Sequence, residues 1–282
     1  MSQLKVSAGS LSVRLPDGRC LGYSEYGVAN GNPVLFFHGA PGSGYIHADM
    51  AEIAAQRGVR LIGVDRPGYG VSDPHAGRTF LSWANDVAAL TDALGFGRFS
   101  IIGFSAGTPY LLACALCLPE RIKRLALVGA MVPGVTEGMP AITSGLYALA
   151  QTNPDELRKT CAAVASSAAA LFDTVSSTAA EVDKLILNDR AGEFQRDYAR
   201  VLFGGVEGLV SDFLLISGNP GFSVEKINAE VHLFSGTADQ NTPPAMTESL
   251  ASQLPNSHVH RLQGEGHFVM YTHWDEILRC LG

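Results

Sequence analysis

The stretch Gly103-Phe104-Ser105-Ala106-Gly107 decides the fold, because its G-x-S-x-G pattern separates two contrasting segments. The apolar run Phe99–Ile102 before it is typical of a buried strand, and Thr108–Leu118 after it has a helical pattern. A serine on a sharp strand-to-helix turn points its hydroxyl group outward under backbone strain, which neighbouring glycines tolerate. N–H groups at the start of the helix face the same place. Ser105 is therefore a candidate nucleophile, with an incidental serine on an ordinary turn as the alternative.

An upstream segment can complete such a site. Residues 33–37 form a short apolar run typical of a buried strand, and the run ends in His38-Gly39-Ala40-Pro41-Gly42-Ser43-Gly44. A loop so rich in glycine and proline can turn its backbone N–H groups toward a ligand. We expect the N–H groups of Ala40 and Ala106 to form an oxyanion hole. Without Ser105, an ordinary Gly/Pro turn would be the preferred interpretation.

Two polar residues near the other end of the chain also follow strand-like segments. Val231–Phe234 runs into a loop that carries Asp239, and His258–Leu262 is followed by a glycine-flanked loop that carries His267. The carboxyl ends of parallel strands meet at one edge of a sheet, where functional side chains gather. The chain order Ser105, Asp239, His267 is the order of a Ser-Asp-His triad on this type of sheet. The sequence thus predicts these three residues as catalytic.

With these motifs the chain resembles the α/β-hydrolase superfamily, in particular its cap-bearing members, which include esterases, proline iminopeptidases, epoxide hydrolases, haloalkane dehalogenases and C–C bond hydrolases. Asp65–Ser72 is similar to the D-x-P-G-x-G-x-S loop of that group. The resemblance has motif-level matches over residues 11–132 and 227–282 and is loose between them. Dehalogenases and epoxide hydrolases carry aspartate where this chain has Ser105. Proline iminopeptidases carry H-G-G-P-G, where this chain has Ala40 as the third residue.

The order of strand-like and helical patterns predicts an α/β fold, with a mostly parallel central sheet and flanking helices. We expect residues 1–132 and 227–282 to form the core, beginning with a hairpin. Strand-like runs vanish in residues 133–226, where we expect a helical cap over the carboxyl edge of the sheet, with Asn153 capping one helix. A packing domain remote from the site is the alternative. Candidates for a pocket wall in this segment are Tyr147, Leu171, Phe172, Phe203, Phe213 and Leu214.

Composition is consistent with a soluble enzyme of one large core, since 46% of the 282 residues are hydrophobic. The net charge of −7 is spread without a basic block, so neither nucleic acid nor an anionic membrane is an expected partner. The longest apolar run, Tyr110–Leu118, is too short to span a bilayer. Met1–Leu15 lacks the apolar core of a secretory signal, and the five cysteines lack framework spacing. A cytoplasmic location is therefore expected.

Neither a metal nor an organic cofactor is expected. The sequence contains no G-x-G-x-x-G pattern and no P-loop. Cys114 and Cys117 form a C-x-x-C pair without a second pair, which favours packing inside the helix over metal or redox chemistry. His258 and His260 alternate on a short strand with no carboxylate cluster nearby in the sequence, which argues against a metal site.

Four other polar residues have structural interpretations. Asp212 lies in the predicted cap and is the one serious rival to Asp239 as the acid, but nothing places it after a strand. We expect His38 to brace the oxyanion loop by hydrogen bonding. Asp65 and Asp73 flank a Gly/Pro-rich turn, where Asx turns or salt bridges are expected.

The reaction that these residues predict is hydrolysis of a small, largely apolar carboxylic ester. Ser105 would attack the acyl carbon, His267 would transfer the proton, and Asp239 would orient the imidazole ring. C–C bond or amide hydrolysis with the same triad is the alternative among enzymes. A ligand-sensing protein of this fold with little turnover is the alternative among binding proteins. The fold and the triad alone do not fix the substrate.

Overall fold

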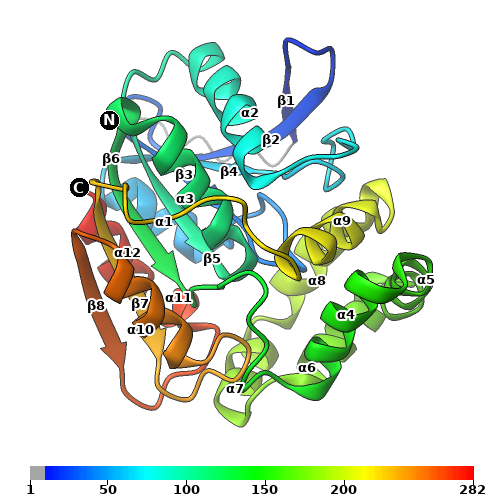
Figure 1. Cartoon of the computed structure of the whole chain (residues 1–282). Helices are drawn as coiled ribbons and strands as arrows, with labels where there is room; N and C mark the ends of the chain where they lie inside the picture. Colours follow the sequence, from blue (N-terminus) through cyan, green and yellow to red (C-terminus); the bar gives the residue numbers. More distant parts are fainter. Residues whose placement is uncertain (1–9) are drawn as a thin grey trace.

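The computed structural model describes residues 10–282, which form an eight-stranded sheet covered by helices (Figure 1). The strand order is β1-β2-β4-β3-β5-β6-β7-β8. The strands are β1 (Leu11–Arg14), β2 (Cys20–Gly27), β3 (Asn32–Phe37), β4 (Val59–Val64), β5 (Phe99–Phe104), β6 (Ile122–Val128), β7 (Glu230–Gly236) and β8 (Ser257–Leu262).

The predicted α/β fold class is confirmed by the strand directions. Strand β2 runs antiparallel to both of its neighbours, whereas all adjacent pairs from β4 to β8 are parallel. Strands β1 and β2 form the expected hairpin, in which Leu11 is paired with Tyr23. Parallel neighbours require crossover connections, so helices cover both faces of the sheet and the carboxyl ends of β3 to β8 share one edge.

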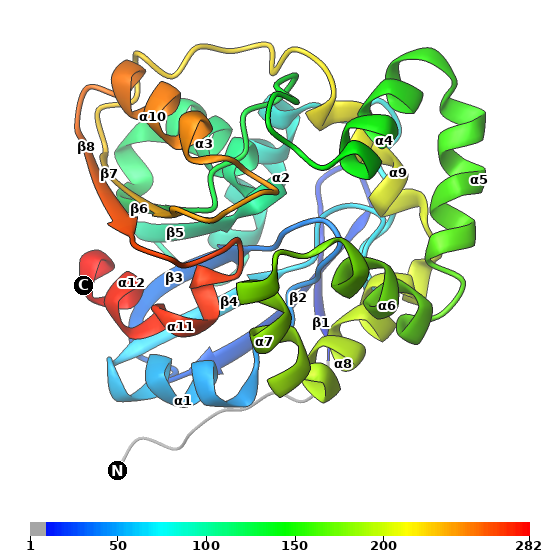
Figure 2. The same ribbon diagram turned by 90° about the horizontal axis from the view of Figure 1, so that it is seen from below.

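Two layers of helices bury the two faces (Figure 2). Leu35 and Phe37 of β3 pack in one apolar cluster with Trp83, while Val34 and Phe36 pack in the other cluster with Trp274. This alternation is the period of two that a strand imposes on its side chains. One layer contains α2 (Phe80–Ala93), α3 (Thr108–Cys117) and α10 (Pro244–Gln253); the other contains α1 (Ala48–Gln56), α11 (Val269–Thr272) and α12 (Trp274–Leu281).

Residues 133–226, which we call the insertion, connect β6 to β7. Its helices are α4 (Ala141–Thr152), α5 (Pro154–Val164), α6 (Ala168–Thr178), α7 (Glu181–Asp189), α8 (Ala191–Val201) and α9 (Glu207–Ile216). The Asn153 side chain accepts a hydrogen bond of 3.2 Å from the backbone N–H of Glu156, so the predicted N-cap is confirmed. Figures 1 and 2 show the insertion beyond one edge of the sheet rather than on either face.

A buried ionic cluster anchors the insertion to the core. Asp212 of α9 accepts from Arg66 at 2.5 Å, Arg78 at 2.6 Å, Tyr69 at 2.8 Å and Tyr110 at 2.7 Å. Burial alone would raise the pKa of Asp212, but the two guanidinium groups outweigh burial and hold that pKa well below its usual range. Asp212 is therefore a charged structural anchor, and it makes no hydrogen bond to a histidine.

A second anchor involves the loop after β4. Asp65 accepts from Arg200 of α8 at 2.7 Å and from the backbone N–H of Gly44 at 2.8 Å. Asp73 accepts from the backbone N–H of Cys20 at 2.7 Å. Asp65 thus forms the expected kind of salt bridge, whereas Asp73 has a structural role of another kind, as the acceptor for a distant backbone N–H group.

No helix among residues 10–282 is both long enough and apolar enough to cross a membrane. The first nine residues, which belong to the predicted core segment 1–132 and to the Met1–Leu15 stretch, lie outside the described residues. Three single-turn 3-10 helices occur among the described residues. They are Ser105–Gly107, Pro119–Arg121 and Leu202–Gly204.

Candidate active site

Ser105 occupies the strained turn that its sequence context predicts. Strand β5 ends at Phe104, a single 3-10 turn covers Ser105–Gly107, and α3 begins at Thr108. Ser105 has a φ of +51°, and among residues 10–282 it is the one non-glycine residue with positive φ. A Cβ atom at Gly107 would lie 2.2 Å from the carbonyl oxygen of Phe37, so the turn needs glycine there.

His267 and Asp239 are brought together from two loops at the same edge of the sheet. The distance from Nδ1 of His267 to Oδ2 of Asp239 is 2.9 Å. The other oxygen of Asp239 accepts from the backbone N–H groups of Asn241 and Thr242, both at 2.8 Å. The Thr242 hydroxyl donates to Oδ2 of Asp239 at 2.7 Å. The carboxylate is thus fixed by its own loop and directed at the imidazole ring.

The environment of His267 favours the protonated imidazolium. His267 is 5% exposed, and burial acts to lower its pKa. The negative charges of Asp239 and Asp183 outweigh burial, so the pKa of His267 lies above its usual value. The Phe104 ring packs beside it, with 5.0 Å between ring centroids. A base that gains stability when protonated is suited to remove a proton from a neighbouring hydroxyl group.

The loop predicted to carry one oxyanion donor, residues 38–44, is held in place by Arg66 and His38. The Gly39 carbonyl accepts from the Arg66 guanidinium at 2.9 Å and lies 2.8 Å from Nδ1 of His38. Because C=O and N–H point in opposite directions across a trans peptide, fixing this carbonyl aims the Ala40 N–H away from Arg66. Burial holds the pKa of His38 well below its usual range, so its ring is neutral. His38 therefore braces the loop, as the sequence predicted.

The insertion contributes a carboxylate that sequence reasoning missed. Asp183 of α7 accepts from the backbone N–H groups of His267 and Phe268, each at 2.9 Å. A Cβ atom at Gly266 would lie 2.3 Å from the same carboxylate. The loop that carries His267 is thus clamped by the insertion as well as by the core. No local pattern marks Asp183, because its partners lie more than 80 residues further along the chain.

A cavity of about 190 Å³ opens over these groups. Ser105, His267, Ala40 and Ala106 all line it, and half of the lining residues come from the insertion. Of the six residues that the sequence suggested for the pocket wall, three line the cavity and three do not. Those that line the cavity are Tyr147, Leu171 and Phe213; those that do not are Phe172, Phe203 and Leu214.

The cavity wall is more apolar than polar, and no arginine or lysine of residues 10–282 lines it. Among the described lining residues, the one carboxylate is Asp197 of α8, which accepts a hydrogen bond from the Ser43 hydroxyl. Burial raises the pKa of Asp197 to about 7. A negatively charged ligand in this cavity would therefore meet a partly ionised acid, and no arginine or lysine among residues 10–282 would offset its charge.

The family model described as "alpha/beta hydrolase fold" matches residues 32–273. The chain belongs to this family. A 2-hydroxy-6-oxononadienedioate/2-hydroxy-6-oxononatrienedioate hydrolase of Burkholderia vietnamiensis is 26% identical, over 92% of this chain and 88% of that protein. A non-heme chloroperoxidase of Streptomyces lividans is 27% identical, over 93% and 94% of the two chains.

Solved structures agree on the fold of this α/β hydrolase. A thermophilic esterase from Thermogutta terrifontis superposes with a TM-score of 0.73 at 19% identity, over 97% of this chain and 96% of the other. At that identity the likeness shows the shared fold. The family makes the chain a hydrolase, while the relatives carry names that differ in substrate and reaction.

Proposed function

We propose that this α/β hydrolase cleaves a small, neutral, largely apolar carboxylic ester through an acyl-enzyme intermediate. Ser105 attacks the acyl carbon while His267 accepts its proton and then delivers it to the leaving alcohol. Asp239 holds the imidazole tautomer and stabilises the imidazolium. The N–H groups of Ala40 and Ala106 bind the oxyanion. Water, activated by His267, then releases the acid and regenerates Ser105.

One observation carries this proposal. Ser105, His267 and the two oxyanion residues all line one cavity, and the His267–Asp239 hydrogen bond of 2.9 Å orients the base. A nucleophile, a base, an orienting acid and oxyanion donors around one space are the requirements of acyl transfer. We further propose that the insertion, which supplies half of the lining residues, acts as a cap that excludes water and shapes the pocket.

The charge of the cavity supports a neutral substrate. A carboxylate on the substrate would lose its hydration without gaining a guanidinium or ammonium partner, since no arginine or lysine among residues 10–282 lines the cavity. Asp197 adds repulsion where it is ionised. The dienedioate in the name of the Burkholderia relative carries two carboxylates, so the cavity of this chain is poorly matched to that compound.

C–C bond hydrolysis with the same triad is the second candidate, and the names of several relatives favour it. The two candidates differ in the charge of the substrate. For an amide, the same residues would serve and His267 would protonate an amine instead of an alcohol.

The test uses matched p-nitrophenyl esters. One series carries neutral acyl chains of graded length, and the other carries acyl chains of equal length that end in a carboxylate. We expect kcat/KM to favour the neutral member of each pair by at least tenfold at pH 8, with a burst of p-nitrophenol as the acyl-enzyme accumulates. Asp197→Asn removes the negative charge from the cavity wall, so it should reduce the ratio of kcat/KM between the neutral and the anionic ester of each pair.

Three results would contradict the proposal. A preference for the anionic member would favour the dicarboxylate-like substrates of the relatives. Turnover that survives in Ser105→Ala would exclude the acyl-enzyme route. Tight ester binding with negligible turnover in the wild-type protein would favour a ligand sensor.

A further inference from the structure

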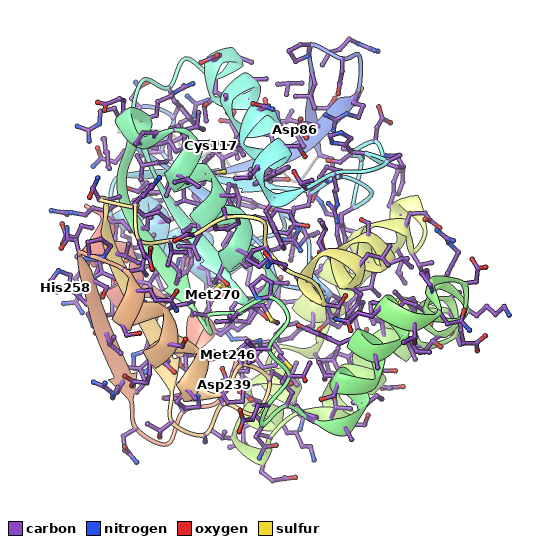
Figure 3. All side chains as sticks on the ribbon, in the orientation of Figure 1. Asp86, Cys117, Asp239, Met246, His258 and Met270 are labelled. Atoms are coloured by element: carbon purple, nitrogen blue, oxygen red, sulfur yellow. The ribbon has the colours of Figure 1, made fainter. Side chains whose placement is uncertain are left out.

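Three side chains that the proposed mechanism does not use meet at the outer edge of the sheet. His232 lies on β7, His260 on β8 and Cys280 on α12, and their ligand atoms all lie within 4.8 Å of one another. All three residues are partly buried. Figure 3 shows the labelled His258 on the outer strand of this edge, whereas the labelled Asp239 lies toward the insertion.

The register of the parallel strands creates this cluster. His232 is paired with His258, and Phe234 with His260, so side chains two residues apart on each strand share one face. The rings pack closely: His260 stacks on Phe234 with 4.3 Å between centroids, and His232 stacks on His258 at 5.1 Å. Helix α12 covers the same face, since Phe234 belongs to its apolar cluster, and this brings Cys280 to the histidines.

The distance between the two ring nitrogens fits a shared metal ion. Nδ1 of His232 lies 3.1 Å from Nε2 of His260. Two imidazole nitrogens bound tetrahedrally at about 2.0–2.1 Å from Zn²⁺ lie about 3.3 Å apart. The Cys280 sulfur lies within 4.8 Å of one ring nitrogen of each histidine, and a tetrahedral site needs about 3.6 Å. A small movement of one side chain therefore completes three ligands.

A carboxylate lies on the outer side of each histidine, and the one beside His232 is within hydrogen-bond distance. Nε2 of His232 lies 3.0 Å from Oε1 of Glu230, whose other oxygen accepts from Arg124 at 3.1 Å. Nδ1 of His260 lies 3.7 Å from Glu276. A carboxylate that accepts the outer N–H of an imidazole leaves the inner nitrogen free to bind a metal, which is the usual arrangement around ligating histidines.

We propose that His232, His260 and Cys280 form a Zn²⁺ site, with water as the fourth ligand. Binding replaces the hydrogen bond between the two rings by two metal–nitrogen bonds. The proton between the rings moves to Nδ1 of His260, which faces Glu276, and the Cys280 thiol releases its proton to solvent and binds as thiolate. The site joins β7, β8 and α12, so its role is to fasten the last helix to the edge of the sheet. Asp239 and His267 lie on the loops after β7 and β8, which the ion would hold in place.

The sequence-based expectation of no metal site rested on His258 and His260 alone. His232 is far from them in the sequence, and the carboxylates become neighbours through β7 and α12. Of the two histidines considered, His260 belongs to the proposed ligand set, while the exposed His258 stacks outside it.

The experiment titrates the purified full chain, without a histidine tag, with Co²⁺ and then with Zn²⁺. We expect one Co²⁺ per chain, a thiolate-to-cobalt charge-transfer band, intense visible bands of tetrahedral Co²⁺, and loss of all bands when Zn²⁺ displaces it. Cys280→Ser should remove the charge-transfer band, and Glu230→Gln should weaken binding by roughly 10- to 100-fold. Cys117→Ser, which changes an exposed thiol on α3, should change neither the charge-transfer band nor the affinity for the metal.

Thermal unfolding supplies a second readout and shows that each variant is folded before metal is added. Zn²⁺ should raise the Tm of the wild-type chain and of Cys117→Ser, and leave that of Cys280→Ser unchanged. Absence of stoichiometric Co²⁺ binding, or a charge-transfer band that survives in Cys280→Ser, would overturn the site. An equal rise in Tm for the wild-type chain and Cys280→Ser would overturn it too. None of these readouts depends on esterase activity.

Discussion

The strand-end loops and the insertion both contribute to the site, but in different ways. The loops carry Ser105, Asp239 and His267, the residues proposed to do the chemistry. The insertion carries three buried carboxylates, and each contacts the core through a different kind of partner. Asp183 accepts from backbone N–H groups of the His267 loop, and Asp197 accepts from the Ser43 hydroxyl. Asp212 accepts from the Arg66 and Arg78 guanidinium groups.

The strand-end loops are thus proposed to carry out the reaction, and the insertion carboxylates hold the insertion on the core. A buried carboxylate is costly unless partners satisfy it, so each insertion carboxylate ties α7, α8 or α9 to a defined point of the core. Arg66 illustrates the connection, because the same guanidinium that binds Asp212 also binds the Gly39 carbonyl, next to Ala40 of the proposed oxyanion hole. Changes at strand ends should therefore abolish turnover, whereas changes in the insertion should alter stability, pH dependence or selectivity.

The largest effect is expected for the nucleophile. Ser105→Ala should lower kcat by roughly 10⁴- to 10⁶-fold, because the triad acts as a unit. The Tm should change little, since alanine fits the turn. A fluorophosphonate should label the wild-type chain at Ser105, as located by mass spectrometry, and should not label the variant. More than a tenth of wild-type activity in the variant would remove Ser105 from the chemistry.

The two aspartates that competed as the triad acid give the sharpest test of the comparison. Asp239→Asn should lower kcat on the order of 10⁴-fold at neutral pH, the loss that accompanies the wrong histidine tautomer in serine proteases. Its Tm should stay near that of the wild-type chain. Kinetics and thermal unfolding on the same preparation separate the two effects.

Asp212→Asn should behave in the opposite way. It leaves two buried guanidinium groups without their counter-charge, which costs about 3–5 kcal/mol when one partner of a buried pair is removed. The loss should appear as a lower Tm, with a much smaller loss of kcat per folded molecule than in Asp239→Asn. If Asp212→Asn instead abolished turnover in a folded chain, the acid would lie in the insertion.

An intermediate effect is expected for Asp183, which acts through the position and charge of its neighbours. Asp183→Asn keeps one acceptor oxygen but turns an NH₂ group toward the other backbone N–H. Loss of one buried hydrogen bond costs about 1–3 kcal/mol, here from the free energy that holds the His267 loop in position. We therefore expect kcat/KM to fall roughly 10- to 100-fold. Asp173→Asn, at an exposed position on α6, is the control and should have no effect.

The pH profile distinguishes this role from simple destabilisation. His267 must be neutral to accept the serine proton, and its pKa is raised, so kcat/KM should rise along a limb above pH 6.5. Asp183→Asn removes a negative charge that raises this pKa, and the limb should therefore shift to lower pH. If Asp183→Asn lost activity while the pH profile of kcat/KM stayed in place, the charge of Asp183 would not affect the pKa of His267.

The sequence predicted the strand-end loops well because each leaves a local signal. An apolar run followed by Gly103–Gly107 or by the glycines around His267 marks a turn, and parallel pairing brings such turns together. The contacts of Asp183, Asp197 and His232 have no such signal. Each depends on which face of a helix or strand meets a segment far along the chain, and periodicity alone leaves that choice open.

The smallest effect is expected at the wall of the cavity and tests whether the insertion selects the substrate. Leu171 lines the cavity, whereas Leu185 of α7 is 71% exposed and does not, so the same substitution can be compared at both positions. A buried methylene contributes about 0.8 kcal/mol, close to a fourfold change in kcat/KM. Leu171→Ala should therefore move the preference of the neutral ester series toward longer acyl chains by several-fold, with fluorophosphonate labelling of Ser105 retained. Leu185→Ala should leave the preference unchanged. If both variants matched the wild-type chain, the core loops would set the length of the pocket, and the insertion would serve only as the anchor that its buried carboxylates describe.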